Sequence, residues 1–99
     1  MTLAQLQQLI RDRYFATDSA RGTPGTFMHL TEEFGELATA LYNNNRPTRP
    51  PTPEERANLE EEFADVLAWL ATLANINDID LTACMQKYID PTRVSGIKD

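Results

Sequence analysis

The segment NNNRPTRPPTP, residues 43–53, constrains the fold of this chain more than any other feature, because it cannot be helical. Its four prolines lack the backbone N–H that a helix interior needs, and its three asparagines favour turns. On both sides of it, apolar residues recur at helical spacing. The segment therefore divides the 99 residues into helical parts joined by a semi-rigid connection.

Two helices are predicted before this connection. Thr2 and Gln5 fit a capping box ahead of a helix over residues 3–15. The glycines and proline of TDSARGTPGT, residues 17–26, predict a loop. A second helix is expected from residue 26 to residue 42, with an apolar stripe made of Leu30, Phe34, Leu37 and Leu41.

A long helix is predicted after the connection, over residues 53–75. Thr52 and Glu55 fit a second capping box, and Pro53 occupies the first helical position, where proline is favoured. The apolar stripe of this helix consists of Leu59, Phe63, Val66, Leu67, Leu70 and Leu73.

A short last helix is predicted over residues 81–89, capped by Asp80 and ended by Pro91, with Cys84 as a small core residue. Nothing alternates with period two over a strand length. We therefore expect an all-α, single-domain fold over residues 1–99, a bundle of about four helices in which the two long ones pack antiparallel. Because so short a chain buries a modest core, we expect a homodimer or homotetramer to complete it.

Charge and composition exclude some classes of function. The net charge of −6 argues against general binding to a nucleic-acid polymer or an anionic membrane. No apolar run approaches the roughly 20 residues of a membrane span, and the N-terminus lacks the pattern of a secretory signal. A single cysteine excludes an internal disulfide, so a cytoplasmic location is the simpler expectation.

Four carboxylates occupy matching positions on the two long helices. Glu33 and Glu36 are three residues apart on one flank of the first stripe, and Glu62 and Asp65 repeat this spacing beside the second. Antiparallel packing brings the two acidic flanks together. Repulsion between two such charges 5 Å apart is about 3 kcal/mol at an effective dielectric constant near 20. No lysine or arginine lies three or four residues from any of the four.

A hard divalent cation would relieve this repulsion. Carboxylate oxygens suit Mg²⁺, Mn²⁺ or Ca²⁺, whereas zinc prefers histidine or cysteine and a di-iron bundle needs two Glu-x-x-His pairs, which are absent. Mg²⁺ commonly meets substrate phosphates, so the site suggests phosphate-ester or phosphoanhydride chemistry. The alternative is a structural acidic bundle, because clusters of glutamate are often solvated helix faces without a metal.

The chain resembles a known family at these residues. The string EEFGE, then 25 residues, then EFAD, matches the EExxE…ExxD signature of MazG-like nucleotide pyrophosphohydrolases, which belong to the all-α NTP pyrophosphatase superfamily. LTEEFGELATAL and EEEFADVLAWLATLANINDIDL also read like helices of that family. The resemblance covers residues 30–88 and is closest to the short, single-domain members.

The resemblance implies hydrolysis of a nucleoside triphosphate between its α and β phosphates, with Mg²⁺ as the metal and Mn²⁺ as a substitute. House-cleaning of the nucleotide pool is the role it implies. Glu32 would then be a supporting acid or would orient a water. The metal ligands implied by motif position are Glu33, Glu36, Glu62 and Asp65, of which the first two are also catalytic.

The C-terminal element departs from the family pattern. Lys87 and Arg93 match the lysine and arginine that family members use to bind substrate, but Asp90 occupies the position of an asparagine. An acid there would disfavour a polyphosphate, which keeps open a catalytically silent module that binds a nucleotide or a protein.

Two aromatic side chains share the acidic flank. His29 precedes Glu33 by four residues, and is either a contact to phosphate or metal-bound water or an ordinary surface histidine. Trp69 follows Asp65 by four residues, and either stacks on a base of the substrate or fills an interface.

Overall fold

The structure is a computed structural model that describes residues 1–93, and over this range it is helical without strands. Its elements are α1 (Leu3–Asn44), α2 (Pro53–Ile76), α3 (Leu81–Cys84) and α4 (Gln86–Ile89). The predicted all-α class is confirmed. Within residues 1–93, no helix combines the length and the apolar character that a membrane span requires.

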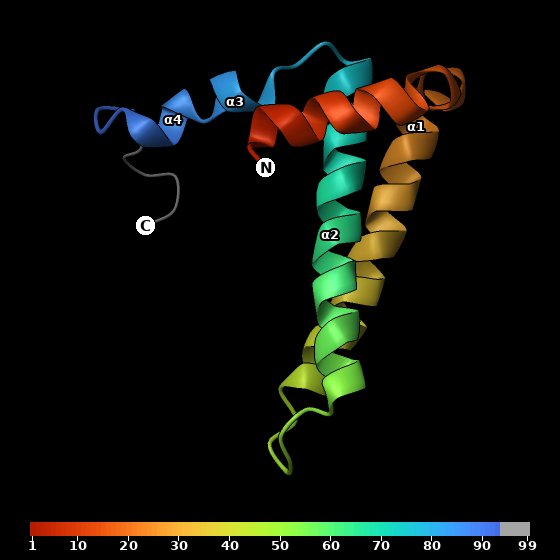
Figure 1. Cartoon of the computed structure of the whole chain (residues 1–99), viewed down its shortest axis with the longest axis vertical. Coiled ribbons are helices and arrows are strands. Elements are labelled where there is room, and N and C mark those ends of the chain that lie inside the picture. Colours follow the sequence, from red (N-terminus) through yellow and green to blue (C-terminus); the bar gives the residue numbers. More distant parts are fainter. Residues whose placement is uncertain (94–99) are drawn as a thin grey trace.

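The predicted loop over residues 17–26 is wrong, because this segment belongs to α1 and is helical except at Gly22. Gly22 has φ 79° and ψ 176°, a conformation that glycine adopts at little cost, and the axis of α1 turns sharply around it (Figure 1). Pro24 follows in the first turn after the break, where its missing N–H costs little. Asp18 and Arg21 support the helical turn before the break with an ion pair of 3.1 Å.

The two long helices of the prediction form a helical hairpin. The second half of α1, residues 23–44, descends beside α2, which returns antiparallel to it (Figure 1). Thr52 and Glu55 form the expected capping box, with Pro53 in the first turn of α2. Arg49 in the connection adds an ion pair of 2.7 Å to Glu55, which fixes the closed end of the hairpin.

The first half of α1, residues 3–21, crosses the other end of the hairpin (Figure 1). Thr2 and Gln5 form the capping box predicted at its start. The side-chain amide of Asn75, near the end of α2, donates a hydrogen bond to the backbone oxygen of Gln7 over 3.2 Å. The crossing segment is therefore tied to α2.

The predicted helix over residues 81–89 is instead two helices of four residues each, separated by Met85. Asp80 caps α3 as expected, by accepting hydrogen bonds from the N–H groups of Thr82 and Ala83. The N–H of Met85 donates to the oxygen of Thr82, a tightened turn that interrupts the regular helix. We call residues 81–89 the C-terminal arm.

The arm is hydrogen-bonded to α1 where it begins, and its remaining residues are not buried. The Gln7 side chain donates to the backbone oxygen of Ile79 over 2.6 Å and accepts from the N–H of Leu81 over 2.9 Å. Beyond this clamp the arm extends away from the hairpin (Figure 1). No residue of α3 or α4 is buried.

The core is smaller than the sequence predicted. The buried apolar residues in the described part are Ile10, Leu30, Ala40, Leu59, Ala71 and Ala74. Five members of the predicted stripes are exposed, namely Phe34, Leu41, Phe63, Leu67 and Leu70. Two helices bury only a narrow strip along their seam, and these stripes are wider than that strip. Cys84, expected in the core, is also exposed, because it lies on the arm.

Candidate metal centre

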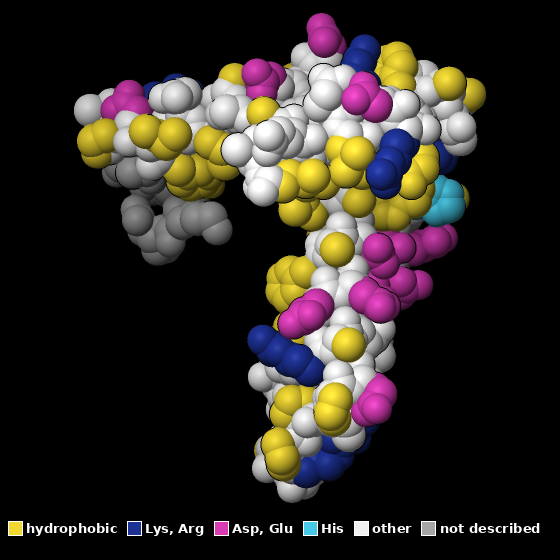
Figure 2. All heavy atoms as spheres, viewed as in Figure 1, with side chains coloured by type: hydrophobic (Ala, Val, Ile, Leu, Met, Phe, Trp, Pro, Cys, Tyr) yellow, Lys and Arg dark blue, Asp and Glu magenta, His cyan; other side chains and the backbone are white. Residues whose placement is uncertain are grey.

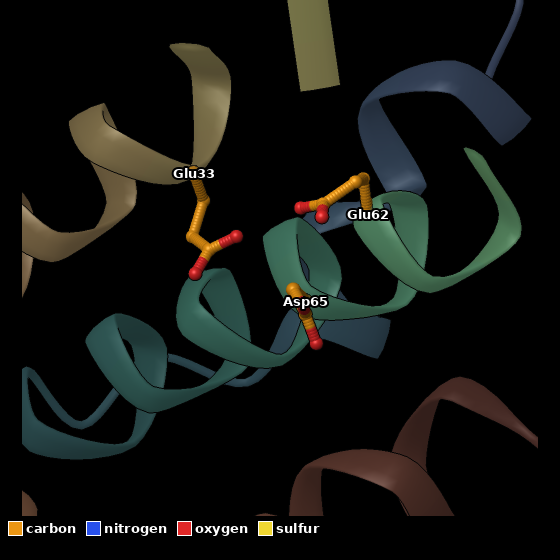
Figure 3. Close-up of side chains that lie close together, drawn as sticks. All are labelled: Glu33, Glu62 and Asp65. Carbon is orange, nitrogen blue, oxygen red and sulfur yellow. The ribbon is translucent and has the colours of Figure 1, made fainter. Parts of the chain in front are cut away.

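Three of the four predicted ligands meet across the seam of the hairpin. Carboxylate oxygens of Glu33, Glu62 and Asp65 all lie within 4.8 Å of one another. Glu33 comes from α1, and its side chain and that of Glu62 project toward each other from the two helices (Figure 3). We call these three residues the acidic cluster. It forms because Glu33 and Glu62 each follow a buried seam leucine, Leu30 and Leu59, by three residues, and Asp65 follows Glu62 by the same helical spacing.

Glu36 stands next to the acidic cluster. Its carboxylate is not among the three that lie within 4.8 Å, and the residue is exposed. Its charge nevertheless acts on both helices, because it raises the pKa of Glu33 and of Glu62. The structure therefore brings all four predicted ligands into one region of negative charge.

The cluster is strained by its own charge. The pKa of Glu33 is raised to about 7, first by burial and then by contact with Glu36 and the charge of Asp65. Burial, followed by the charge of Glu36, also raises the pKa of Glu62. Within residues 1–93, no lysine or arginine forms an ion pair with these carboxylates.

The donor set fits a hard divalent cation. The Oε2 atoms of Glu33 and Glu62 are buried, and neither has a hydrogen-bond partner in the described part of the chain. Buried polar atoms normally have partners, so two such oxygens facing one space are unusual. Both are carboxylate oxygens, which Mg²⁺ and Mn²⁺ prefer. Glu33, Glu62 and Asp65 could hold such an ion, with Glu36 adjacent.

Glu32 and His29 lie beside the cluster on the outer surface of α1. Nδ1 of His29 is 3.7 Å from a carboxylate oxygen of Glu32; the Glu32 side chain is 64% exposed and that of His29 is 41% exposed. Glu32 thus points toward solvent and the histidine, in a position from which a carboxylate can contact water at the rim of the site.

Trp69 links the acidic cluster to the crossing segment of α1. The His29 ring stacks on it with centroids 4.9 Å apart and planes within 12°. The guanidinium carbon of Arg21 also lies 4.9 Å from the centre of the Trp69 ring. The tryptophan ring is therefore already in contact with two side chains, so a base at this point would displace one of them or lie at the ring edge.

A cavity of about 250 Å³ opens beside Trp69, lined by Ile10, Tyr14, Asp18, Arg21, Ala68, Trp69 and Thr72. Asp18 is 3% exposed; it accepts a hydrogen bond from Thr72 over 3.1 Å and pairs with Arg21. Sequence reasoning missed this pair because it placed the segment in a loop. The spacing of Asp18 and Arg21, three residues apart, was the signal available for a helix.

A second cavity, of about 290 Å³, lies between the start of α1 and the end of α2. None of the predicted site residues lines it. Gln7, Arg11, Asn75 and Asp80 are among its walls, and several of these hold the arm and the crossing segment in place.

The arm does not bring its cations to the acidic cluster. Lys87, in the arm, and Arg93, four residues beyond its end, are exposed. The arm lies on the side of the hairpin away from the gathered acidic side chains (Figures 1 and 2). Asp90 accepts hydrogen bonds from the N–H and the hydroxyl of Thr92, which lower its pKa. The Asp90 carboxylate therefore makes its hydrogen bonds to Thr92, two residues away, and not to the acidic cluster.

Comparison with known proteins identifies a family. The family model of the MazG nucleotide pyrophosphohydrolase domain matches residues 23–92, more than half of the chain. The match begins where the hairpin begins, and contains the acidic cluster, Glu36 and Lys87. Among curated proteins no relative matches the chain.

Proposed function

The chain belongs to the MazG nucleotide pyrophosphohydrolase family, and from this premise we propose that it hydrolyses nucleoside triphosphates to a nucleoside monophosphate and pyrophosphate with Mg²⁺. The observation that carries the proposal is the meeting of Glu33, Glu62 and Asp65 oxygens within 4.8 Å. Family membership supports the substrate class, and the acidic cluster supports the metal. Clearing unwanted nucleotides from the pool is the role we propose.

The acidic cluster would hold Mg²⁺ through Glu33, Glu62 and Asp65, with Glu36 completing the negative site. The bound ion would neutralise the triphosphate and lower the pKa of a water molecule. Glu32, at the exposed rim, is placed to accept a hydrogen bond from that water and orient it. Mn²⁺ has the same preference for oxygen ligands and would substitute.

The nucleoside would extend from the acidic cluster toward the cavity beside Trp69. Trp69 is one helical turn beyond Asp65, and Thr72 in the cavity wall is two turns beyond it, about 10 Å along α2. His29 and Trp69 would contact the nucleoside, while Tyr14 and Thr72 offer hydroxyl groups for polar contacts. Lys87 and Arg93 would bind the phosphates.

A panel of canonical and modified nucleoside triphosphates, incubated with the protein and Mg²⁺, tests this function by release of pyrophosphate. We expect release with at least one substrate and its loss in Glu36→Gln, whereas Glu60→Gln, an exposed glutamate outside the cluster, should retain it. Nucleotide binding without any turnover would instead favour a silent binding module. The position of the arm, away from the cluster, is the observation that favours this second candidate.

A further inference from the structure

A cavity at the root of the C-terminal arm gathers charges of both signs. It is the cavity of about 290 Å³ between the start of α1 and the end of α2, where the chain leaves α2 and turns back toward α3 (Figure 1). Its walls include Arg11 from α1, and Asp78 and Asp80 from the segment that joins α2 to α3. We call it the arm-root cavity.

The charged residues of the arm-root cavity do not neutralise one another. Within residues 1–93, neither Arg11 nor Asp78 nor Asp80 takes part in an ion pair. Opposite charges that line one small space attract each other, so other contacts must hold these three side chains apart. The cavity therefore presents a cation and two anions whose charges are all available to a ligand.

Arg11 is held on the α1 side of the cavity. Its guanidinium carbon lies 3.9 Å from the centre of the Phe15 ring. Its Nη1 donates to the backbone oxygen of Asn75 over 3.5 Å, which is a long and weak hydrogen bond. A guanidinium carries several further N–H donors, so Arg11 is positioned by these contacts but keeps donors for a carboxylate.

The two aspartates are held by the turns between α2 and α3. Asp80 caps α3 through Oδ1, which accepts two backbone hydrogen bonds and leaves Oδ2 for another donor. Asp78 has φ 56°, in the left-handed region, within a turn closed by a hydrogen bond of 2.8 Å from the Ile79 N–H to the Ala74 oxygen. Both carboxylates are therefore fixed in place before any ligand arrives.

A buried amide adds an acceptor to the same wall. Asn75 lines the cavity and is 6% exposed. Its Nδ2 donates to the backbone oxygen of Gln7 over 3.2 Å, whereas its Oδ1 accepts no hydrogen bond from the described residues. Buried polar side chains normally have partners for their polar atoms. An ammonium group inside the cavity could supply the missing donor.

We propose that the arm-root cavity binds a free α-amino acid with a cationic side chain, of the lysine or arginine type. Its α-carboxylate pairs with Arg11, and its two cationic groups pair with Asp78 and Asp80. Two acids beside one guanidinium match a ligand with two cations and one anion. Ligand sites usually have volumes of about 300–1,000 Å³, so this cavity suits a small molecule. The aspartates would repel the phosphates of a nucleotide.

Such a ligand would tie the C-terminal arm to α1. Gln7 already connects the two, through hydrogen bonds to the backbone of Ile79 and Leu81. A ligand between Arg11 and the aspartates adds a second connection across the same junction. Because no residue of α3 or α4 is buried, these connections hold the arm in its direction. The bound amino acid therefore restricts the arm, at a site apart from the acidic cluster.

Binding is tested by calorimetry of the full chain with L-lysine and L-arginine at low ionic strength, where exposed charges are least screened. We expect one site per chain with a dissociation constant of about 1 mM or lower for at least one of them. Arg11→Gln should weaken binding at least about tenfold. Arg13→Gln, an exposed arginine outside the cavity, is the matched control. No binding of either amino acid in this range overturns the proposal.

The aspartates can be neutralised without disturbing their turns. Asn is tolerated in the left-handed region and caps helices as well as Asp does, so Asp78→Asn and Asp80→Asn should keep the fold, which circular dichroism checks. Each should weaken L-lysine binding at least about tenfold. Glu60→Gln, an exposed acid elsewhere, should not. Unchanged binding in both aspartate variants overturns their role.

Ligand analogues assign each contact. Norleucine lacks the side-chain ammonium of lysine, and cadaverine lacks the carboxylate, so both should bind more weakly than L-lysine. Arg11→Gln should weaken L-lysine but leave cadaverine nearly unchanged, because cadaverine has no group for Arg11. Asp78→Asn or Asp80→Asn should reduce the preference for L-lysine over norleucine. If Arg11→Gln weakens cadaverine as much as L-lysine, then the pairing of Arg11 with the carboxylate is wrong.

The effect on the arm is measured by amide hydrogen exchange over residues 81–89. Saturating L-lysine should slow exchange there severalfold in the wild type and not in Asp78→Asn, because the added connection opposes local opening. Exchange at the closed end of the hairpin, residues 45–52, should not change and serves as the internal control. Exchange in the arm that is unaffected by bound L-lysine overturns the link between the cavity and the arm.

Discussion

Glu33 on α1 and Glu62 on α2 each bury one carboxylate oxygen, and within residues 1–93 neither oxygen has a hydrogen-bond partner. The two residues are 29 positions apart in the sequence and meet only because the hairpin closes. A fold that brings like charges together in this way loses stability unless a cation joins them. The stability of the metal-free protein should therefore depend on the charge repulsion within the acidic cluster.

Neutralising Glu33 should stabilise the metal-free protein. Glu33→Gln keeps the shape of the side chain and removes one charge from the acidic cluster, so we expect the thermal midpoint to rise by a few degrees, the change that about 1 kcal/mol produces in a domain of this size. The same variant should lose the increase in midpoint that Mg²⁺ gives the wild type. Differential scanning fluorimetry with and without Mg²⁺ measures both.

Glu60→Gln is the matched control for this experiment. It removes the same charge from an exposed position of α2 outside the cluster, and should leave both the metal-free midpoint and the Mg²⁺ response within error of the wild type. A lower metal-free midpoint for Glu33→Gln, or an unchanged Mg²⁺ response, would contradict a metal site at Glu33.

Much of this fold was predictable from local signals. The capping boxes at Thr2 and Thr52 were read directly from residue types three positions apart, and both are present. The hairpin followed from two helical patterns separated by a proline-rich connection. The proximity of Glu33, Glu62 and Asp65 followed in turn, because matched spacing on antiparallel helices places acids on facing flanks. Whether they bind a metal stays a prediction.

The sequence-based predictions that were wrong concern features that depend on tertiary contacts. Asp18 lies in a segment that looks like a loop, but its buried hydrogen bond to Thr72, 54 residues away, helps to keep the segment helical. Phe34 and Phe63 belong to helical stripes, yet periodicity predicts only which side is apolar. It does not predict whether the same chain or a partner covers that side.

The Asp18–Arg21 pair should be important for stability. Asp18 is almost fully buried, pairs with Arg21 at 3.1 Å and accepts a hydrogen bond from Thr72. Asp18→Ala leaves the Arg21 cation beside Trp69 without its partner, and we expect a loss of about 3 kcal/mol in the free energy of unfolding. Urea denaturation gives this value. Asp12→Ala, which removes an exposed contact with Gln8, should cost about 0.5 kcal/mol or less.

Acid should weaken the closed end of the hairpin through Glu55. Hydrogen bonds from Arg49 and from the Thr52 N–H lower the pKa of Glu55 to about 2, against an ordinary value of 4.5. The unfolded chain therefore takes up this proton more readily, so the stability that the charge contributes is full above pH 4.5 and falls as the pH approaches 2. The difference in unfolding free energy between wild type and Glu55→Gln should shrink over that range.

Glu54→Gln is the control for the acid experiment, since it changes a neighbouring exposed glutamate in the same first turn of α2. Its difference from the wild type should stay small at every pH. If the Glu55→Gln difference grows on acidification, then the ion pair with Arg49 is not what stabilises the charged form. Urea unfolding between pH 6 and pH 3 covers most of the useful range.

Two glycines of α1 should respond in opposite directions to alanine. Gly22 has φ 79° and ψ 176°, a region of backbone conformation that is essentially restricted to glycine and costs other residues about 1–3 kcal/mol, so Gly22→Ala should destabilise the protein by about that amount. Gly35 lies within a regular helix and has open space where a Cβ would stand, so Gly35→Ala should stabilise by about 0.5–1 kcal/mol. The two changes are chemically identical, so their difference isolates the backbone conformation. If Gly22→Ala is neutral, α1 continues through residue 22 as an ordinary helix, and the first half of α1 would not cross the hairpin as it does in Figure 1.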